Sequence, residues 1–255
     1  MPLELVTIPC LTDNYAYLLH DDGTGATALI DAPEPAPILA ALEARSWQLS
    51  HVFLTHHHWD HIDGLDPILQ AHPAKVIGAE ADAHRLPKLD LAVAEGDRIP
   101  FGGDTVQVLE VPGHTLGHLA FYLAGNALLF TADSLMALGC GRLFEGSPEQ
   151  MFDSLAKLAA LPGTTTVCSG HEYTQSNAKF AATIDPDNRD LISRIEHTNQ
   201  ARAKGEPTVP SLLSEELATN PFLRCNDPAV QASVGMINAE PQAVFAEIRK
   251  RKDSF

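Results

Sequence analysis

The stretch that decides the fold is His-Val-Phe-Leu-Thr-His-His-His-Trp-Asp-His, residues 51–61. Its first five residues have an apolar centre, Val-Phe-Leu at 52–54, which predicts a central β-strand. Imidazoles and a carboxylate crowd the next six residues, in the loop at the carboxyl end of that strand. Such a cluster has little value for packing, and imidazole and carboxylate are ligands that suit Zn²⁺, Fe or Mn. The stretch therefore predicts a metal site.

Residues two apart on an extended stretch point to the same side. We therefore expect His56, His58 and Asp60 to face one cavity. His57 and Trp59 are expected to face away from it, with His57 in a structural or ligand-orienting role.

The same arrangement recurs at three more predicted strands. Thr105–Val111, Ala127–Thr131 and Thr164–Cys168 are each followed by one potential ligand, respectively His114, Asp133 and His171. Strands of a sheet that run in the same direction bring such ends to one edge, where α/β sheets place their sites. Seven ligands would then meet: His56, His58, Asp60, His61, His114, Asp133 and His171. One tetrahedral ion needs fewer, so the pattern predicts two divalent ions and a bridging carboxylate.

The remaining histidines carry weaker signals. His20, His51, His72, His84 and His197 are expected to be core or surface residues, and His118 to have a structural or ligand-orienting role. Asp133 taken alone could be a turn residue or a helix cap. A histidine-rich metal-storage tract is the alternative for residues 56–61, but such a tract need not coincide with strand ends spread along the chain.

Periodicity along the chain predicts a layered α/β domain followed by a helical one. Further strands are expected at Leu3–Ile8, Tyr15–His20, Ala26–Asp31, Lys75–Gly78 and Leu119–Leu123. Helices are expected at Pro35–Arg45, Leu65–Ala71 and Pro148–Leu161, the last with Ser147 as N-cap. Beyond about Thr174 the pattern predicts only helices, at Pro186–Ala203, Pro228–Gly235 and Pro241–Lys252. We place the domains at residues 1–173 and 174–255.

The composition of the chain excludes some classes of binding partner and indicates a cellular compartment. The 255 residues include 17 Lys and Arg against 33 Asp and Glu, for a formal net charge of −16. So acidic a chain repels polyphosphate, which argues against nucleic-acid binding and against an anionic membrane surface. The four cysteines form no Cys-x-x-Cys pair, and no secretory signal or apolar run of membrane-spanning length occurs. We expect a cytoplasmic protein.

The motifs at residues 55–61 and 112–118, with Asp133 and His171, resemble those of the metallo-β-lactamase superfamily. Six further stretches narrow the resemblance to the glyoxalase II family, the hydroxyacylglutathione hydrolases: Asp13–Tyr15, Phe130–Leu135, Gly139–Arg142, Gly170–Thr174, Asn220–Arg224 and Arg249–Asp253. The resemblance covers nearly the whole chain. It implies a four-layer αββα sandwich followed by a smaller α-helical, substrate-binding domain.

The resemblance also implies a role for each ligand. One ion is held by His56, His58 and His114. The second is held by Asp60, His61 and His171, and Asp133 bridges both. The expected ions are Zn²⁺, with Fe or Mn as alternatives.

For the glutathione part of the substrate, the family pattern points to a set of six residues: Arg142, Phe144, Tyr173, Asn177, Arg249 and Lys252. Arg142 stands where Lys is frequent and keeps the charge. Phe144 stands where Tyr is frequent and loses the hydroxyl, so one hydrogen bond to the glutathione backbone is expected to be missing.

The activity implied by the resemblance is hydrolysis of the thioester S-(D-lactoyl)glutathione to D-lactate and glutathione, which completes methylglyoxal detoxification. A metal-bridging hydroxide would attack the thioester carbon, with Asp60 and Asp133 as catalytic residues and Asp60 orienting the nucleophile. We expect a monomer with a small-molecule partner. Three alternatives share the fold: a β-lactamase, a glutathione-persulfide dioxygenase with a single iron, and a non-catalytic metal-binding protein.

Overall fold

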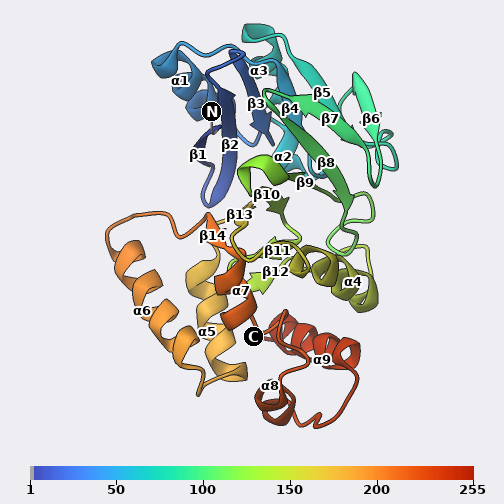
Figure 1. Ribbon diagram of the computed structural model, residues 1–255, viewed down its shortest axis with the longest axis vertical. Helices are drawn as coiled ribbons and strands as arrows, with labels where there is room; N and C mark the ends of the chain where they lie inside the picture. The colour runs from blue at the N-terminus through green and yellow to red at the C-terminus, as the bar shows by residue number, and fades with distance from the viewer. Residues whose placement is uncertain (1–2) are drawn as a thin grey trace. The chain divides into compact units, whose positions relative to one another are not determined.

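The computed structural model describes residues 3–255 (Figure 1). They form two compact units that interleave along the chain. The first unit runs to Glu110 and resumes at Leu116–Thr131. The second comprises Val111–Thr115 and Ala132–Phe255.

A six-stranded sheet organises the first unit. Its strands lie in chain order: β1 (Glu4–Cys10), β2 (Asn14–Asp21), β3 (Ala26–Ile30), β4 (His51–Phe53), β5 (Lys75–Ala79) and β6 (Leu91–Val93). The first three strands are antiparallel, and β3 to β6 are parallel. Parallel neighbours need crossover connections, which are supplied by α1 (Pro35–Arg45), α2 (Trp59–Ile62) and α3 (Leu65–Ala71). The metal-ligand stretch is therefore the crossover that leaves β4.

An antiparallel meander forms the second layer of this unit. Its strands are β7 (Arg98–Phe101), β8 (Asp104–Glu110), β9 (Leu119–Leu123) and β10 (Leu128–Ala132), with a 3₁₀ turn at Ala124–Asn126. Because β8 and β10 are both antiparallel to β9, they run in the same direction and end at the same edge. Their carboxyl ends lead to His114 and Asp133 respectively.

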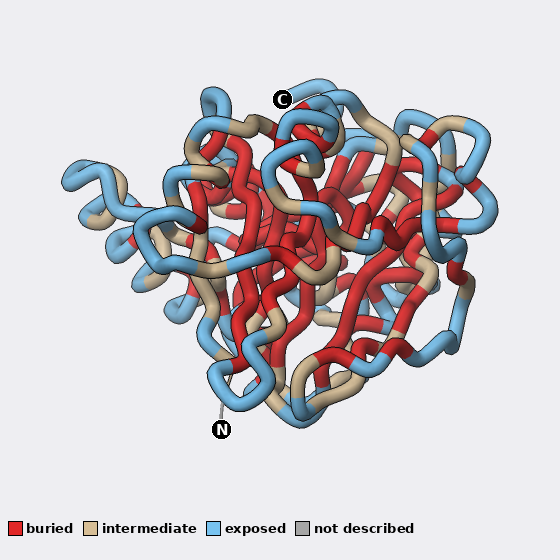
Figure 2. The backbone as a smooth tube through the Cα atoms, turned by 90° about the horizontal axis from the view of Figure 1, so that it is seen from above, coloured by how far each residue is buried: buried red, intermediate tan, exposed pale blue. Residues whose placement is uncertain are grey.

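Aromatic contacts join the two layers of the first unit. Tyr17 packs on Phe130 with ring centroids 5.6 Å apart, and Phe53 packs on Phe121 at 5.1 Å. All eight residues of β2 and all five of β9 are buried. Figure 2 shows buried segments, in red, running through the inside of the molecule and exposed ones, in pale blue, around its outside. Burial on both faces explains why β9 is a continuous apolar run, Leu-Ala-Phe-Tyr-Leu.

The second unit is mainly helical. Its helices are α4 (Pro148–Ala159), α5 (Thr174–Ile184), α6 (Arg189–Ala203), α7 (Leu213–Thr219), α8 (Pro228–Ser233) and α9 (Pro241–Asp253). Short strands accompany them: the hairpin β11 (Leu135–Met136) and β12 (Gly139–Cys140), and the antiparallel pair β13 (Thr166–Ser169) and β14 (Ser211–Leu212). Leu138, Ala178, Ala181 and Leu191 form a buried cluster between the hairpin, α5 and α6.

Several sequence predictions of local structure are confirmed. The helices at Pro35–Arg45 and Leu65–Ala71 and the strand at Leu119–Leu123 have the predicted bounds. Ser147 caps α4 by accepting from the Gln150 N–H, in a complete capping box.

The expectation of no strand beyond Thr174 is wrong, because β14 pairs with β13 through Thr166–Leu212 and Val167–Ser211. Two residues are too few to show a period in sequence. The helix α5 also went unpredicted, since its N-cap, Tyr173, makes no side-chain capping hydrogen bond.

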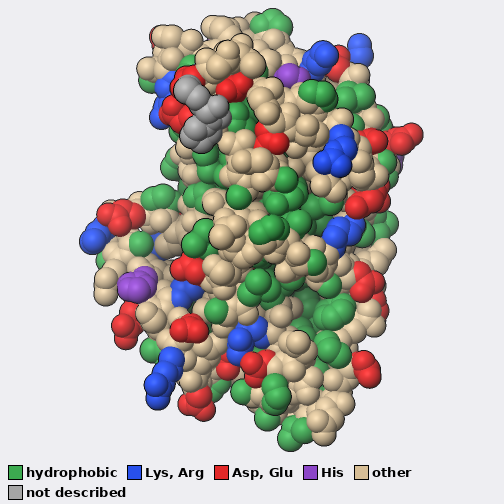
Figure 3. Space-filling view, viewed as in Figure 1, with side chains coloured by type: hydrophobic (Ala, Val, Ile, Leu, Met, Phe, Trp, Pro, Cys, Tyr) green, Lys and Arg blue, Asp and Glu red, His purple; other side chains and the backbone are tan. Residues whose placement is uncertain are grey.

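Acidic and basic side chains are interspersed over the face drawn in Figure 3. Among residues 3–255, no helix combines the length and the apolar character that crossing a membrane requires.

Candidate metal centre

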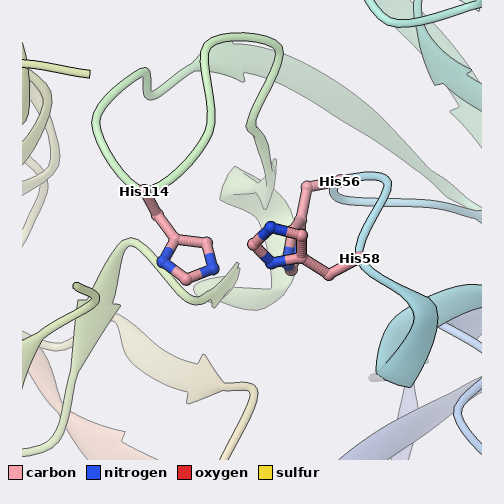
Figure 4. A group of neighbouring side chains, drawn as sticks. All are labelled: His56, His58 and His114. Carbon is pink, nitrogen blue, oxygen red and sulfur yellow. The ribbon is translucent and has the colours of Figure 1, made fainter. Parts of the chain in front are cut away.

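The first unit places His56 and His58 in the turn between β4 and α2. The Nε2 atom of His56 lies 3.1 Å from the Nδ1 atom of His58, so two ring nitrogens face a common point. Two ligands of a tetrahedral zinc ion are separated by about 3.3 Å, given zinc–nitrogen bonds of about 2.0–2.1 Å. The rings of His56 and His58 lie side by side in Figure 4. The other ring nitrogen of His56 lies 3.0 Å from the Thr55 hydroxyl, which fixes the ring. This pair is spaced as ligands of one ion.

Asp31 orients His61. Its Oδ2 lies 2.8 Å from the Nδ1 atom of His61, and its carboxylate also accepts from the Thr55 N–H and hydroxyl, each at 2.8 Å. His61 is fully buried, and this contact leaves its Nε2 as the atom that can bind a metal. That Nε2 lies 3.9 Å from Asp60 Oδ2.

Asn14 holds the carboxylate of Asp60. Its amide nitrogen donates to Asp60 Oδ2 and to the Asp60 carbonyl, both at 3.0 Å. Asn14 opens β2, so the tight turn between β1 and β2 reaches the ligand stretch. The sequence motif Asp13–Tyr15 contained this residue, but its spacing gave no indication of the role.

The prediction that the chain is extended through Asp60 is wrong, because helix α2 begins at Trp59. A helical turn brings Asp60 and His61 onto adjacent positions. His57 points elsewhere, with its Nδ1 3.1 Å from Asp82 Oδ2, and Trp59 is 64% exposed.

The second unit contributes ligands from three separate loops. Asp133 follows β10, His171 follows β13, and His114 lies on the loop between β8 and β9 (Figure 4). Asp133 Oδ2 lies 3.3 Å from the Nε2 of His114 and 3.3 Å from the Nε2 of His171. One carboxylate oxygen equidistant from two imidazole nitrogens has the geometry expected of a bridging ligand.

The ring of His114 is oriented by the main chain. Its Nδ1 lies 2.7 Å from the carbonyl oxygen of Arg142, which leaves Nε2 for Asp133 and a metal. Gly141, next to Arg142, leaves room for both ligands, since a Cβ there would lie 1.8 Å from the Asp133 carbonyl oxygen and 3.1 Å from His114 Nδ1. Only glycine fits at this position.

The donor set suits a divalent metal. Three groups of side chains could each hold an ion: His56, His58 and His114; His56, His61 and Asp133; and Asp60, His61 and His171. All seven predicted ligands occur in these groups, and His57 and His118 do not. Imidazole nitrogens and carboxylate oxygens are ligands of Zn²⁺, Fe and Mn alike.

Two aromatic residues predicted to bind substrate flank the ligands of the second unit. Tyr173 stacks on His171 with centroids 4.6 Å apart and an interplanar angle of 6°. Phe144 contacts His114 edge-on at 5.2 Å and is 61% exposed. Its exposed ring is available to a ligand, but it offers no hydroxyl.

Two of the predicted basic residues, Arg142 and Arg249, contact the carboxylate of Asp253. The Arg249 Nη2 donates to Asp253 Oδ1 at 2.8 Å, and the Arg142 Nε lies 3.8 Å from the same oxygen. Arg249 is buried and its Nη1 donates to the Cys140 carbonyl, whereas the Arg142 side chain is 61% exposed. Lys252 is half-buried over the rings of Phe180 and Phe255. The pKa of its ammonium group is lowered, mainly by burial and also by the positive charge of Arg249 nearby.

Asn177 is enclosed in the fold. It is 6% exposed, and its amide nitrogen donates to the Ala137 carbonyl at 3.0 Å. The Asn177 amide nitrogen thus helps to hold the turn that contains Ala137. The contact of Asn177 with substrate stays a prediction.

Sequence reasoning missed Asp31, although the signal was present. Asp31 ends the predicted strand Ala26–Asp31, so it follows the same pattern of a polar residue at a strand end. Its function depends on His61, thirty residues later, and the pattern alone does not join them.

Two family models match the chain. Residues 12–171 match the model described as metallo-beta-lactamase superfamily, and residues 172–255 match hydroxyacylglutathione hydrolase C-terminus. With its site of histidines and aspartates and a match over more than half its length, the chain belongs to the metallo-β-lactamase superfamily.

Similar proteins narrow the assignment. A hydroxyacylglutathione hydrolase of Ruegeria pomeroyi is 65% identical over 255 residues, covering 100% of each chain. One of Cereibacter sphaeroides is 60% identical over 255 residues, again covering 100% of each. Within the superfamily, the chain is a member of the hydroxyacylglutathione hydrolases, the glyoxalase II family.

A solved structure is also similar. The crystal structure of TTHA1623 in a di-iron-bound form has a TM-score of 0.62 and 28% identity, covering 86% of this chain and 100% of that chain. Together with the family models, the comparisons confirm the predicted fold class of a metallo-β-lactamase domain followed by a helical domain.

Proposed function

We propose that the protein hydrolyses the thioester of S-(D-lactoyl)glutathione to D-lactate and glutathione at a centre of two divalent ions. The observation that carries this proposal is the Asp133 carboxylate, whose Oδ2 lies 3.3 Å from the Nε2 atoms of both His114 and His171. A carboxylate so placed suits two ions better than one. The names of the full-length relatives support the choice of substrate.

The ligand sets in this proposal follow the sequence prediction. His56, His58 and His114 would hold one ion, Asp60, His61 and His171 would hold the other, and Asp133 would be shared by both. The short separation of the His56 and His58 nitrogens and the orientation of His61 by Asp31 support these sets. Zn²⁺ is the proposed ion, with Fe or Mn as alternatives, and the di-iron-bound form of TTHA1623 supports a pair of ions.

Bound divalent ions would supply a lowered pKa for water and a counter-charge for the carbonyl oxygen as it becomes negative. The chain's own residues place the reactants. Asn14 fixes Asp60 Oδ2, so the Asp60 carboxylate is held ready to orient the attacking water. The leaving group is a thiolate, with a thiol pKa of about 8.5, so no strong general acid is required.

Glutathione is anionic, and we propose that the second unit binds it. The guanidinium of Arg142 and the ammonium of Lys252 would pair with its carboxylates, and Arg249 would support Arg142 through Asp253. The Tyr173 and Phe144 rings, which lie against His171 and His114, would flank the acyl end. Asn177 completes the predicted set through the hairpin that it holds.

One assay tests the function. Purified protein is offered S-(D-lactoyl)glutathione while its metal content is measured. Hydrolysis with two ions per chain is expected. Turnover of a β-lactam or of glutathione persulfide with no thioester hydrolysis would favour the alternatives, and bound metal without any turnover would indicate a metal-binding protein.

We propose the same domain limits as the sequence suggests, residues 1–173 and 174–255, which the change of family model at residue 172 supports. A cytoplasmic monomer is proposed as well. The four cysteines are free and buried, and burial raises the thiol pKa of Cys10 and Cys225 to about 12, which suits a reducing compartment. Size-exclusion chromatography with light scattering tests the monomer.

A further inference from the structure

The hairpin formed by β11 and β12 lies between the ligands of the second unit and its helices. It begins two residues after Asp133 and ends two residues before Arg142, whose carbonyl orients His114. A backbone hydrogen bond from the Gly141 N–H to the Ser134 carbonyl closes its base. Any shift of the hairpin would therefore displace the Arg142 carbonyl.

The hairpin turn is held from outside by side chains of the helical part. The amide nitrogen of Asn220 donates to the carbonyls of Met136 and Gly139, at 3.1 and 2.9 Å. The Leu138 N–H donates to Glu216 Oε2 at 2.9 Å. Leu138 has a φ of 57°, an uncommon conformation for a branched residue, so the turn depends on these contacts.

Asn220 and Glu216 are anchored in turn. Both side chains are completely buried. Glu216 forms an ion pair with Arg194 and accepts from the Ser211 hydroxyl at 2.7 Å, and it lies 3.2 Å from the Asn220 amide nitrogen. A buried polar network of this kind is rigid when every member has a partner.

The other end of the Asn220 carboxamide reaches toward the predicted glutathione site. Its Oδ1 accepts from the Phe222 N–H at 3.1 Å, and the Arg249 guanidinium lies 5.4 Å from the centre of the Phe222 ring. Arg249 donates to the Cys140 carbonyl in the same hairpin at 3.2 Å. One carboxamide thus holds the hairpin and the aromatic support of Arg249 together.

We propose that Asn220 is a positioning residue for the reaction: its carboxamide fixes the Leu135–Cys140 hairpin and, through the Arg142 carbonyl, the metal-binding orientation of His114. The proposal rests on the proposed function for the ligand role of His114. On this proposal, a residue of the helical part acts on His114 through three main-chain carbonyls, those of Met136, Gly139 and Arg142.

The test compares Asn220→Ala with Asn188→Ala. Asn188 also lies in the helical part, where it caps α6 and donates to the Ala218 carbonyl, and none of its hydrogen bonds reaches the hairpin. Zn²⁺-loaded proteins are mixed with a chromophoric chelator, and zinc release, kcat, KM and Tm are measured. Mutation of a group that orients a metal-binding histidine typically lowers metal affinity by about 10–100-fold. We therefore expect Asn220→Ala to weaken zinc retention about tenfold and to lower kcat.

The control is expected to lower Tm while keeping zinc retention and kcat. Wild-type zinc retention in Asn220→Ala would overturn the proposal, as would an equal loss in Asn188→Ala. If Asn220→Ala does not fold, Asn220→Ser, which keeps a shorter donor, should show a smaller loss in the same direction. Zinc release is measured without substrate, so a wild type that hydrolyses no thioester would overturn the proposed function and leave this comparison decisive.

Discussion

The two units hold their ligands in different ways. In the first, four ligands fall within residues 56–61, and side chains near them in space orient them: Asp31 for His61 and Asn14 for Asp60. In the second, the predicted ligands His114, Asp133 and His171 come from three distant loops, where the Arg142 carbonyl orients His114 and Gly141 leaves room for the Asp133 carbonyl. Ligands held by side chains are open to disruption by one substitution, whereas ligands held by the main chain depend on the whole fold around them.

The largest effect is expected at the bridging ligand. Asp133→Ala should abolish thioester hydrolysis and release both ions, because this carboxylate faces the histidines of both metal sets. His56→Ala should also abolish activity, but it removes a ligand of one predicted set and should leave one ion per chain. Elemental analysis of the dialysed variants gives the two stoichiometries, and full activity in a metal-free variant would be incompatible with the mechanism.

A smaller effect is expected at Asp31. Asp31→Ala leaves every predicted ligand in place but removes the carboxylate 2.8 Å from His61 Nδ1, so metal affinity should fall by about 10–100-fold. Competition with a chelator measures this change. Asp22→Ala is the control, since Asp22 is exposed and, within residues 3–255, its carboxylate forms an ion pair with His20 alone, at 3.4 Å. Equal affinities of Asp31→Ala and wild type would mean that the first unit does not depend on this side chain.

The smallest effect is expected at the C-terminal helix. Lys252→Ala should raise KM severalfold with little change in kcat, because its charge would serve substrate binding and not the reacting atoms. Lys250→Ala, on an exposed position of α9, is the matched control and should leave KM unchanged. Arg249→Ala should raise KM too, with a loss of stability because its buried guanidinium donates to the Cys140 carbonyl and to Asp253. An unchanged KM in the Arg249→Ala and Lys252→Ala double variant would remove this helix from the substrate site.

The same contrast explains what could be predicted from the sequence. Residues 56–61 are contiguous, so their chemistry is visible without any fold, and the strand ends before His114, Asp133 and His171 are marked by apolar runs. The contact between His114 and the Arg142 carbonyl is invisible in sequence, because every residue carries a carbonyl. Asn14 and Asp31 are ordinary polar residues until the fold brings them to Asp60 and His61.

The helical part shows the limit most clearly. The basic run Arg249–Lys252 is plain in sequence, yet Arg249 is 5% exposed and paired with Asp253, whereas Lys250 is exposed. Which side of α9 each residue occupies is decided by packing against the rest of the unit. Short strands such as β11, β12 and β14 exist only because of their pairing partners, so no local period marks them.

Position 142 has a consequence for how this enzyme family can diversify. Its carbonyl oxygen lies 2.7 Å from the Nδ1 atom of His114, and its side chain is 61% exposed. A main-chain contact survives replacement of the side chain above it, so evolution or a protein engineer can retune substrate charge preference at this residue while the ring of His114 keeps its orientation. The side chain at position 142 can thus be varied for substrate selectivity while the main-chain contact to His114 is kept.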